Sequence, residues 1–266
     1  MGPKTDLFEK EFARFCETKY ACAVSSGTAG LHMALIAAGI GPGDEVITTP
    51  FSFIASANSI LYVGAKPVFV EIDSLTYNIN AHKIEAAITA KTKAILPVHI
   101  FGQAAEMDLI MKLARKYKLK VIEDACESLG ATYRGKKVGT FGDMAVVAFY
   151  PNKQMTTGEG GMVITNSKKY YEMCVSLRNQ GRPYSSSSWH SKGGSWLTHA
   201  RLGYNYRMDE MSAAVGLAQI RKIKFLINKR IEIAKWYSEF LKPFSDILQI
   251  PFVDKKNIHT WFLYVV

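Results

Sequence analysis

Lys153 follows an apolar run at residues 144–150 and precedes a glycine-rich turn at residues 158–161. We interpret the apolar run as a strand, so the lysine lies near a strand end, beside backbone that glycine allows to pack closely. Lysine is rarely buried without a reason, and burial favours the neutral amine, which is a nucleophile. The pattern therefore favours an amine that forms a Schiff base with a carbonyl carbon. A surface lysine in a glycine-rich hairpin is the alternative interpretation.

A second segment, residues 120–125, reads as a short apolar strand that ends in the carboxylates of Glu123 and Asp124. A carboxylate at the end of a buried strand needs a cationic partner or several hydrogen-bond donors. The protonated ring nitrogen of pyridoxal 5'-phosphate (PLP) is such a partner, and the aldehyde carbon of the same cofactor bonds lysine. A helix N-cap is the alternative role for Asp124.

A third segment joins a predicted strand at residues 21–24 to an apolar helix through Ser25-Ser26-Gly27-Thr28. The first N–H groups of a helix, with nearby hydroxyl groups, form an anion site that suits phosphate. Alone, this segment is also an ordinary helix start. Together, the three segments predict a phosphate site, a partner for a pyridine nitrogen and a Schiff-base lysine, all at strand ends.

In this order the segments resemble the PLP-dependent sugar aminotransferases of the DegT/DnrJ/StrS type, which belong to the fold-type I aminotransferases. The resemblance extends from about Phe8 to the last residues. Besides the segments above, it rests on Thr49–Asn58, His99–Gly102 with Asp108, Gly139–Asp143, and Gly203–Met208.

The resemblance implies one catalytic residue, Lys153, which carries the cofactor as a Schiff base. It also implies six cofactor-binding residues: Asp124 at the pyridine nitrogen, Gly27 and Thr28 at the phosphate, Phe53 on the ring face, Glu127 near the ring oxygen, and Asn205 at the phosphate in the neighbouring subunit's site.

By the same resemblance, the protein moves an amino group from L-glutamate to a keto group of a nucleotide-diphosphate-linked sugar, and works as a homodimer with shared active sites. One alternative is a sugar dehydratase relative, which is disfavoured because such relatives carry histidine at the position of Lys153. Another is a truncated non-catalytic or regulatory homologue. Retention of Asp124, Lys153, Thr28 and Asn205 together argues against it.

Two features depart from the family pattern. A serine that helps to hold the phosphate is replaced by Ala148, which removes one hydrogen bond. Family members also continue into a small C-terminal domain. We therefore expect residues 1–242 to form a PLP-binding large domain with its trailing helices, and residues 243–266 to start a truncated small domain, with 258–266 as its first strand.

Composition agrees with an enzyme core. The 266 residues are 48% hydrophobic, enough for one large core, and no apolar run approaches the ~18 residues of a membrane span. The four cysteines show no disulfide or metal spacing, so we expect reduced thiols, no metal site and a cytoplasmic location. The net charge is +10, but aromatic residues are not interleaved with the basic runs, so we expect no nucleic-acid partner. The positive charge does suit an anionic substrate.

Apolar runs alternate with helical patterns along the chain, which predicts an α/β fold with a doubly wound, mainly parallel sheet. A long loop at residues 180–201, rich in serine and glycine, is expected near the substrate and the partner subunit. His199 and His99 match family positions, and we expect His32 to be packed. The predicted strands are 21–24, 45–48, 67–71, 93–98, 120–123, 145–150 and 161–165, and the predicted helices 28–38, 53–63, 81–88, 106–118, 167–178, 208–225 and 227–242.

Overall fold

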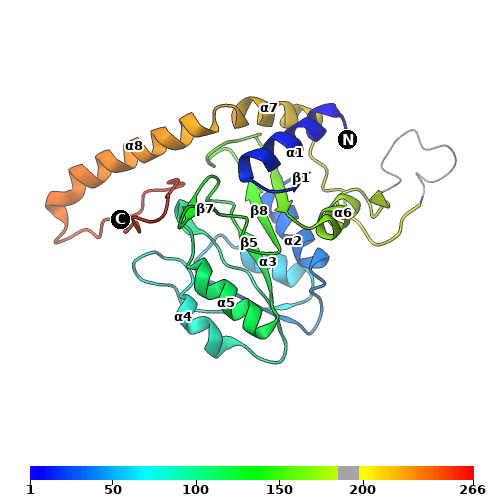
Figure 1. Ribbon diagram of the computed structural model, residues 1–266, viewed down its shortest axis with the longest axis horizontal. Coiled ribbons are helices and arrows are strands. Elements are labelled where there is room, and N and C mark those ends of the chain that lie inside the picture. Colours follow the sequence, from blue (N-terminus) through cyan, green and yellow to red (C-terminus); the bar gives the residue numbers. More distant parts are fainter. Residues whose placement is uncertain (185–197) are drawn as a thin grey trace.

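The computed structural model describes residues 1–184 and 198–266, and a seven-stranded sheet lies at its centre (Figure 1). The order across the sheet is β1-β9-β8-β5-β4-β2-β3. The strands are β1 Tyr20–Val24, β2 Glu45–Thr48, β3 Lys66–Phe69, β4 Thr92–Ile95, β5 Lys120–Asp124, β8 Met144–Ala148 and β9 Gly161–Thr165. A separate hairpin pairs β6 Thr132–Tyr133 with β7 Lys136–Lys137.

All strands of this sheet except β9 run in the same direction. The pairs β2–β3, β2–β4, β4–β5 and β5–β8 are parallel, whereas β9 is antiparallel to both β8 and β1. The prediction of a mainly parallel sheet is therefore confirmed. One predicted strand, 93–98, ends early at Ile95, because Pro97 has no N–H group to donate to a sheet ladder.

Helices cover both faces of the sheet, as a doubly wound fold requires. In β5, Val121 packs in a core with helices α1, α5 and α7, whereas the next residue, Ile122, packs in a second core with α2, α3 and α6. Alternate strand residues point to opposite faces, so each buried strand contributes to both cores. The helices are α1 Pro3–Cys16, α2 Gly27–Ala37, α3 Ala55–Tyr62, α4 Ala81–Ile84, α5 Met107–Tyr117, α6 Lys168–Leu177, α7 Glu210–Ile220 and α8 Ile223–Leu241, with 3₁₀ turns at 85–87, 100–102 and 242–244.

Helix α1 was not among the predicted helices, and it lies beside α7 (Figure 1). Phe8 and Phe12, four residues apart on one face, are fully buried and pack their rings against Phe149. The predicted helix 208–225 stops at Ile220, and the two turn residues Arg221 and Lys222 separate it from α8.

The C-terminal segment, residues 258–266, forms no strand of its own in the structure. It folds back toward the sheet instead, and Figure 1 shows it beneath α8. The Thr260 N–H donates to Gly102 and the Phe262 N–H donates to Phe101. His259 is buried, which lowers the pKa of its imidazole to about 3, and its neutral Nδ1 accepts the Trp261 N–H at 3.0 Å.

Candidate active site

A pocket of about 520 Å³ opens where strands of common direction end. Parallel strands bring their carboxyl ends to one edge of the sheet, so residues far apart in the sequence meet there. The lining combines hydroxyl, carboxyl, amine and aromatic side chains with two glycines. The residues are Ser26, Gly27, Thr28, Leu31, Ser52, Phe53, Ala55, Ser56, Val98, Asp124, Cys126, Glu127, Ala148, Tyr150, Asn152, Lys153, Glu159, Gly160 and Phe262.

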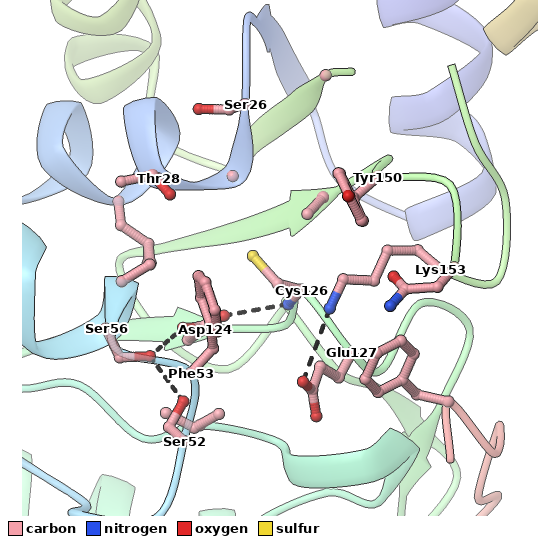
Figure 2. A pocket seen from close by; sticks show the side chains of 18 of the residues that line it. Ser26, Thr28, Ser52, Phe53, Ser56, Asp124, Cys126, Glu127, Tyr150 and Lys153 are labelled. Atoms are coloured by element: carbon pink, nitrogen blue, oxygen red, sulfur yellow. Dashed lines mark hydrogen bonds and ion pairs between the residues drawn. The ribbon is translucent and has the colours of Figure 1, made fainter. Parts of the chain in front are cut away.

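The start of α2 forms one wall of this pocket. Ser26 caps the helix, with its Oγ accepting the Ala29 N–H at 3.1 Å, and Thr28 lies in the first turn (Figure 2). A Cβ atom at Gly27 would lie 2.8 Å from the Ala148 Cβ, and one at Gly161 would lie 2.7 Å from the Ser26 carbonyl. Only glycine at both positions lets the loop approach β8 and β9 this closely, and the helix N-terminus then faces the pocket with its positive end.

Lys153 extends its amine into the pocket. The side chain is 12% exposed, and Nζ lies 3.6 Å from Glu127 Oε1 and 3.9 Å from the centre of the Phe262 ring. Figure 2 shows the lysine and Glu127 side chains pointing toward each other. Burial raises the pKa of the Glu127 carboxyl above its usual value, and the Lys153 charge partly opposes that rise. The other oxygen of Glu127 accepts the Phe101 N–H at 2.9 Å.

Asp124, the last residue of β5, is 4% exposed and lines the same pocket. Its Oδ2 accepts the Ser56 hydroxyl at 2.7 Å, and its Oδ1 accepts the Cys126 N–H at 3.2 Å (Figure 2). Each carboxylate oxygen therefore has one donor and keeps lone-pair capacity for a further donor.

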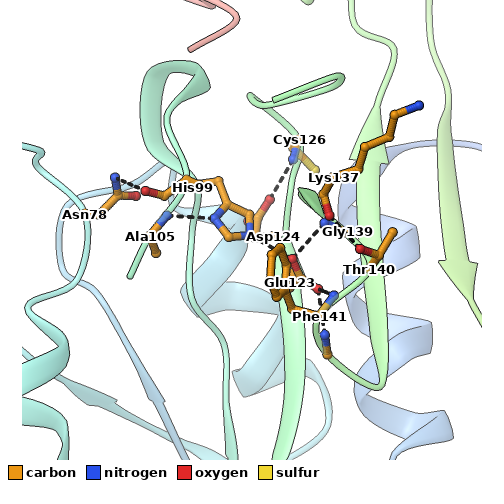
Figure 3. Close-up of polar contacts among 12 residues, drawn as sticks. Asn78, His99, Ala105, Glu123, Asp124, Cys126, Lys137, Gly139, Thr140 and Phe141 are labelled. Carbon is orange, nitrogen blue, oxygen red and sulfur yellow. Dashed lines mark hydrogen bonds and ion pairs between the residues drawn. The ribbon is translucent and has the colours of Figure 1, made fainter. Parts of the chain in front are cut away.

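Behind the pocket, Glu123 supports the end of β5 from the opposite face of the sheet (Figure 3). This fully buried carboxylate accepts the N–H groups of Gly139, Phe141 and Gly142 at 2.7–2.8 Å. It also pairs with His99 Nε2 at 3.1 Å, while His99 Nδ1 accepts the Ala105 N–H, so the neutral ring carries its proton on Nε2. The role of His99, which its sequence position left open, is structural in this arrangement.

The predicted site residues are brought together with one exception. Asn205 is exposed, and it is not one of the described residues that line the pocket. Phe53 lines the mouth and is 72% exposed. The lining also includes Ser52, Ser56, Cys126, Tyr150 and Phe262, which sequence reasoning missed. Ser52 and Ser56 lie within the family-like run 49–58, which was the available signal.

The other sequence expectations have separate outcomes. His32 is packed, at 6% exposure, against Tyr204 and Tyr206. His199 Nδ1–H donates to the Gln180 carbonyl, 2.6 Å away, and residues 185–197 of the predicted loop lie outside the described residues. All four cysteines are free. Over 1–184 and 198–266, no cluster of His, Cys, Asp and Glu side chains suits a metal ion, and no helix is long and apolar enough to cross a membrane.

A lysine amine, a buried carboxylate and a helix N-terminus at the carboxyl edge of a mainly parallel sheet define the large-domain site of a PLP-dependent transferase. Comparison of the sequence with known families agrees. The chain belongs to the DegT/DnrJ/EryC1/StrS aminotransferase family, whose model matches residues 1–266. This family is PLP-dependent, and the fold and enzyme class expected from the sequence are confirmed.

Individual relatives give the same picture. GDP-perosamine synthase of Caulobacter vibrioides is 45% identical over 97% of this chain and 67% of its own length. The X-ray structure of the aminotransferase from Psychrobacter cryohalolentis is 38% identical, with a TM-score of 0.93, over 98% of this chain and 68% of that one. NtdA from Bacillus subtilis, solved with bound cofactor PMP, is 33% identical with a TM-score of 0.89, over 99% of this chain and 58% of that one. The chain thus spans about two thirds of the length of its curated relatives.

The residues present fit PLP. The pocket is large enough for a small cofactor, and it contains one buried carboxylate for the pyridine nitrogen and one primary amine for the aldehyde carbon. Gly27 lines the pocket, and a Cβ there would lie 2.8 Å from Ala148 Cβ and 2.9 Å from Cys126 Sγ, at the helix N-terminus where backbone N–H groups would hold a phosphate group.

Proposed function

We propose that this protein is an aminotransferase that moves an amino group from L-glutamate to a keto group of a nucleotide-diphosphate-linked sugar. The observation that carries the proposal is the presence of Lys153 Nζ and the Asp124 carboxylate in one pocket, beside the start of α2. Chemistry of both half-reactions requires an amine and a carboxylate placed in this way.

Each side chain has a task in this proposal. When bound, PLP supplies a carbon that takes up the amino group and a protonated ring that accepts electrons from the donor's α-carbon. Lys153 Nζ would hold the cofactor covalently, and its free amine would move a proton from the donor's α-carbon to the cofactor carbon that receives the amino group. Asp124 keeps the proton on the pyridine nitrogen, and Phe53 covers the ring face.

The phosphate is assigned to the α2 start, Gly27 and Thr28, where N–H groups and one hydroxyl converge. Ala148 lines the same wall without a polar atom, so it offers no side-chain hydrogen bond to the phosphate. Glu127 is assigned to the ring oxygen of the cofactor. Its carboxylate would contact that oxygen as well as Lys153 Nζ.

The substrate class rests on the relatives, one of which is named GDP-perosamine synthase, and on the net charge of +10. A positive protein attracts a substrate that carries a diphosphate. Glutamate as donor and a homodimer as the working unit remain part of the proposal, as does the division into a PLP-binding domain at 1–242 and the start of a small domain at 243–266.

The test begins with the purified chain and PLP. We expect a visible absorbance band that borohydride abolishes, because reduction of the imine leaves the cofactor permanently bonded to Lys153. The Lys153→Ala variant should lose that fixation. Added L-glutamate should convert the bound cofactor to its pyridoxamine form, and a nucleotide-linked keto-sugar should convert it back.

Three results would count against separate parts. A chain without any band would contradict the cofactor site and favour a non-catalytic homologue. Fixation in Lys153→Ala equal to that of the original chain would contradict the role of Lys153. Conversion by glutamate with no return by any nucleotide-linked keto-sugar would contradict the substrate class alone.

A further inference from the structure

Two serine hydroxyls form a hydrogen-bonded chain that ends on the Asp124 carboxylate. Ser52 Oγ lies 2.8 Å from Ser56 Oγ, and Ser56 Oγ lies 2.7 Å from Asp124 Oδ2. Figure 2 shows the three side chains in a row at the pocket wall. Ser56 is 2% exposed and Asp124 is 4% exposed, so water has little access to the hydrogen bond between them.

The direction of the chain follows from the number of protons. An ionised carboxylate only accepts hydrogen bonds, and a serine hydroxyl has a single proton to donate. Ser56 therefore donates to Asp124, and Ser52 has to donate to Ser56. Both hydroxyl dipoles point toward the carboxylate, and hydrogen bonds to a charged group are stronger than those between neutral groups.

The second oxygen of Asp124 is also fixed, by the Cys126 N–H at 3.2 Å. With one donor on each oxygen, the plane of the carboxylate is held from two elements, the start of α3 and the turn after β5. Rotation of the side chain would break both contacts at once. The remaining lone pairs then keep one orientation in the pocket.

We propose that Ser56, oriented by Ser52, is a positioning residue that holds the Asp124 carboxylate in place for the ring nitrogen of the cofactor. The proposal rests on the function above, since it concerns the same carboxylate. Ser56 acts through Asp124, because its hydroxyl donates a hydrogen bond to the carboxylate oxygen Oδ2 and so fixes the direction of that side chain.

Loss of the Ser56 hydroxyl has a specific consequence. Without this donor the carboxylate can rotate away from the ring nitrogen, so the contact that keeps the ring protonated would be made less of the time. The ring then accepts electrons less well, which slows proton removal from the donor but leaves donor binding almost unchanged.

The same helix supplies a matched control. Ser59 is a fully buried serine of α3, and its hydroxyl donates only to the Ser56 carbonyl within the helix, at 2.9 Å. Ser59→Ala removes a buried hydroxyl of the same kind without touching Asp124. Any difference between Ser56→Ala and Ser59→Ala then reports the carboxylate contact.

The experiment measures PLP-loaded protein in two ways. The first is the pH midpoint of the visible band, and the second is the single-turnover rate with glutamate over a range of glutamate concentrations. For Ser56→Ala we expect a shifted midpoint and a saturating rate lower by about tenfold, the effect of one hydrogen bond to a charged group. The half-saturating glutamate concentration should change by less than about twofold, as for a contact that acts in the transition state.

Further variants make the result specific. Ser52→Ala should change both readouts in the same direction by a smaller factor, since it orients Ser56 and does not touch Asp124. Ser56→Thr keeps the hydroxyl and should return both readouts toward those of the original chain. Asp124→Asn should cause a larger loss than Ser56→Ala. Urea unfolding of each variant checks that it is folded, and Ser52→Ala provides the test where a residue-56 variant does not fold.

The outcomes separate this inference from the function beneath it. If Asp124→Asn lowers the rate but Ser56→Ala and Ser52→Ala behave as Ser59→Ala does, the positioning role is overturned and the function stands. If Asp124→Asn leaves the rate and the band unchanged, or the original chain shows no band, the function of the carboxylate fails and the inference fails with it.

Discussion

Glu127 holds a carboxylate inside the pocket at a cost to the folded state. Its side chain is 12% exposed, and its pKa is raised above the usual value because burial disfavours the charged form, even with Lys153 Nζ 3.6 Å away. A group with a raised pKa binds its proton more tightly when the chain is folded. The stability that it contributes is therefore largest below about pH 4.5 and falls as pH rises through the raised value.

Glu127→Gln should remove this pH dependence. The amide has nearly the same shape, and its oxygen can still accept the Phe101 N–H. We expect the free energy of unfolding of the variant, minus that of the original chain, to increase from pH 4.5 upward. The slope can reach at most about 1.4 kcal/mol per pH unit, the limit for one proton.

Urea titrations of the cofactor-free protein between pH 4.5 and 8 would measure this difference. Glu239→Gln, at a side chain that is 64% exposed on α8, is the control, and its difference should stay flat. A Glu127→Gln difference that stays flat with pH would show that Lys153 offsets the effect of burial on the Glu127 pKa, and one that decreases would show that Lys153 outweighs it. Either result would contradict the prediction.

The sequence placed Lys153, Asp124 and the Gly27-Thr28 turn at strand ends, and parallel strands end at one edge of the sheet. Glu127 was assigned through the family resemblance alone. Ser56 could not be placed in this way. It lies inside α3, and its contact with Asp124 depends on how that helix packs on the sheet, which local sequence does not specify.

At the scale of elements, α1 is joined to the sheet by a buried ion pair. Glu9 of α1 accepts the Ala23 N–H at 2.8 Å and pairs with Arg178, which follows α6 and also donates to the Ala23 carbonyl. Both charged side chains are less than 9% exposed, so each depends on the other for compensation. The pair connects two helices to β1, which leads into the loop at residues 25–28, the proposed phosphate site.

Glu9→Gln should destabilise the protein by about 3–5 kcal/mol, since it leaves the Arg178 charge buried without its partner. Glu11→Gln is the matched control on the same helix. Its partner Arg14 is 76% exposed, and such surface pairs contribute less than about 1 kcal/mol. Chemical denaturation at pH 7.5 would compare the two variants. If Glu9→Gln and Glu11→Gln lower the free energy of unfolding equally, breaking the buried Glu9–Arg178 pair costs no more than breaking the exposed Glu11–Arg14 pair.

Sequence patterns predicted the central elements better than this connection. Strand β5 and helix α5 have clear apolar patterns, and their predicted and observed ends agree within about two residues. Helix α1 buries Phe8, Phe12, Ala13 and Cys16 on one face, and this face packs mainly against α7 and β1. Phe8, Phe12 and Cys16 are four positions apart, so the sequence did contain a helical pattern here that the predicted elements left out.

At the scale of the molecule, one predicted cofactor residue lies outside the pocket of its own chain. Asn205 is exposed, next to Tyr206, whose carbonyl accepts the Ser25 N–H beside the start of α2. The backbone at residues 205–206 thus passes close to the loop at residues 25–28, but the Asn205 side chain is exposed to solvent. Apolar side chains near the pocket mouth are also exposed, among them Phe53 at 72% and Ile54 at 60%. Exposed apolar surface of this kind is typical of contacts between chains.

These features suit a symmetric dimer in which each Asn205 serves the partner's pocket. Lys153→Ala and Asn205→Ala would then disable different sites. A mixed dimer of the two variants has one pocket with both defects and one with neither. We expect mixtures of two weakly active variants to recover a substantial part of the glutamate-driven conversion, up to about one quarter of the original activity at equal amounts and random exchange.

The measurement is the rate of pyridoxamine formation after the two variants have exchanged subunits, with each variant alone as the reference. Exchange is verified by tagging one variant and isolating tagged dimers that contain both chains. If mixed dimers are no more active than their parents, Asn205 and Lys153 of one chain act in the same pocket. That result would contradict shared sites even if the protein proved to be dimeric, because a dimer with independent pockets cannot restore activity by mixing.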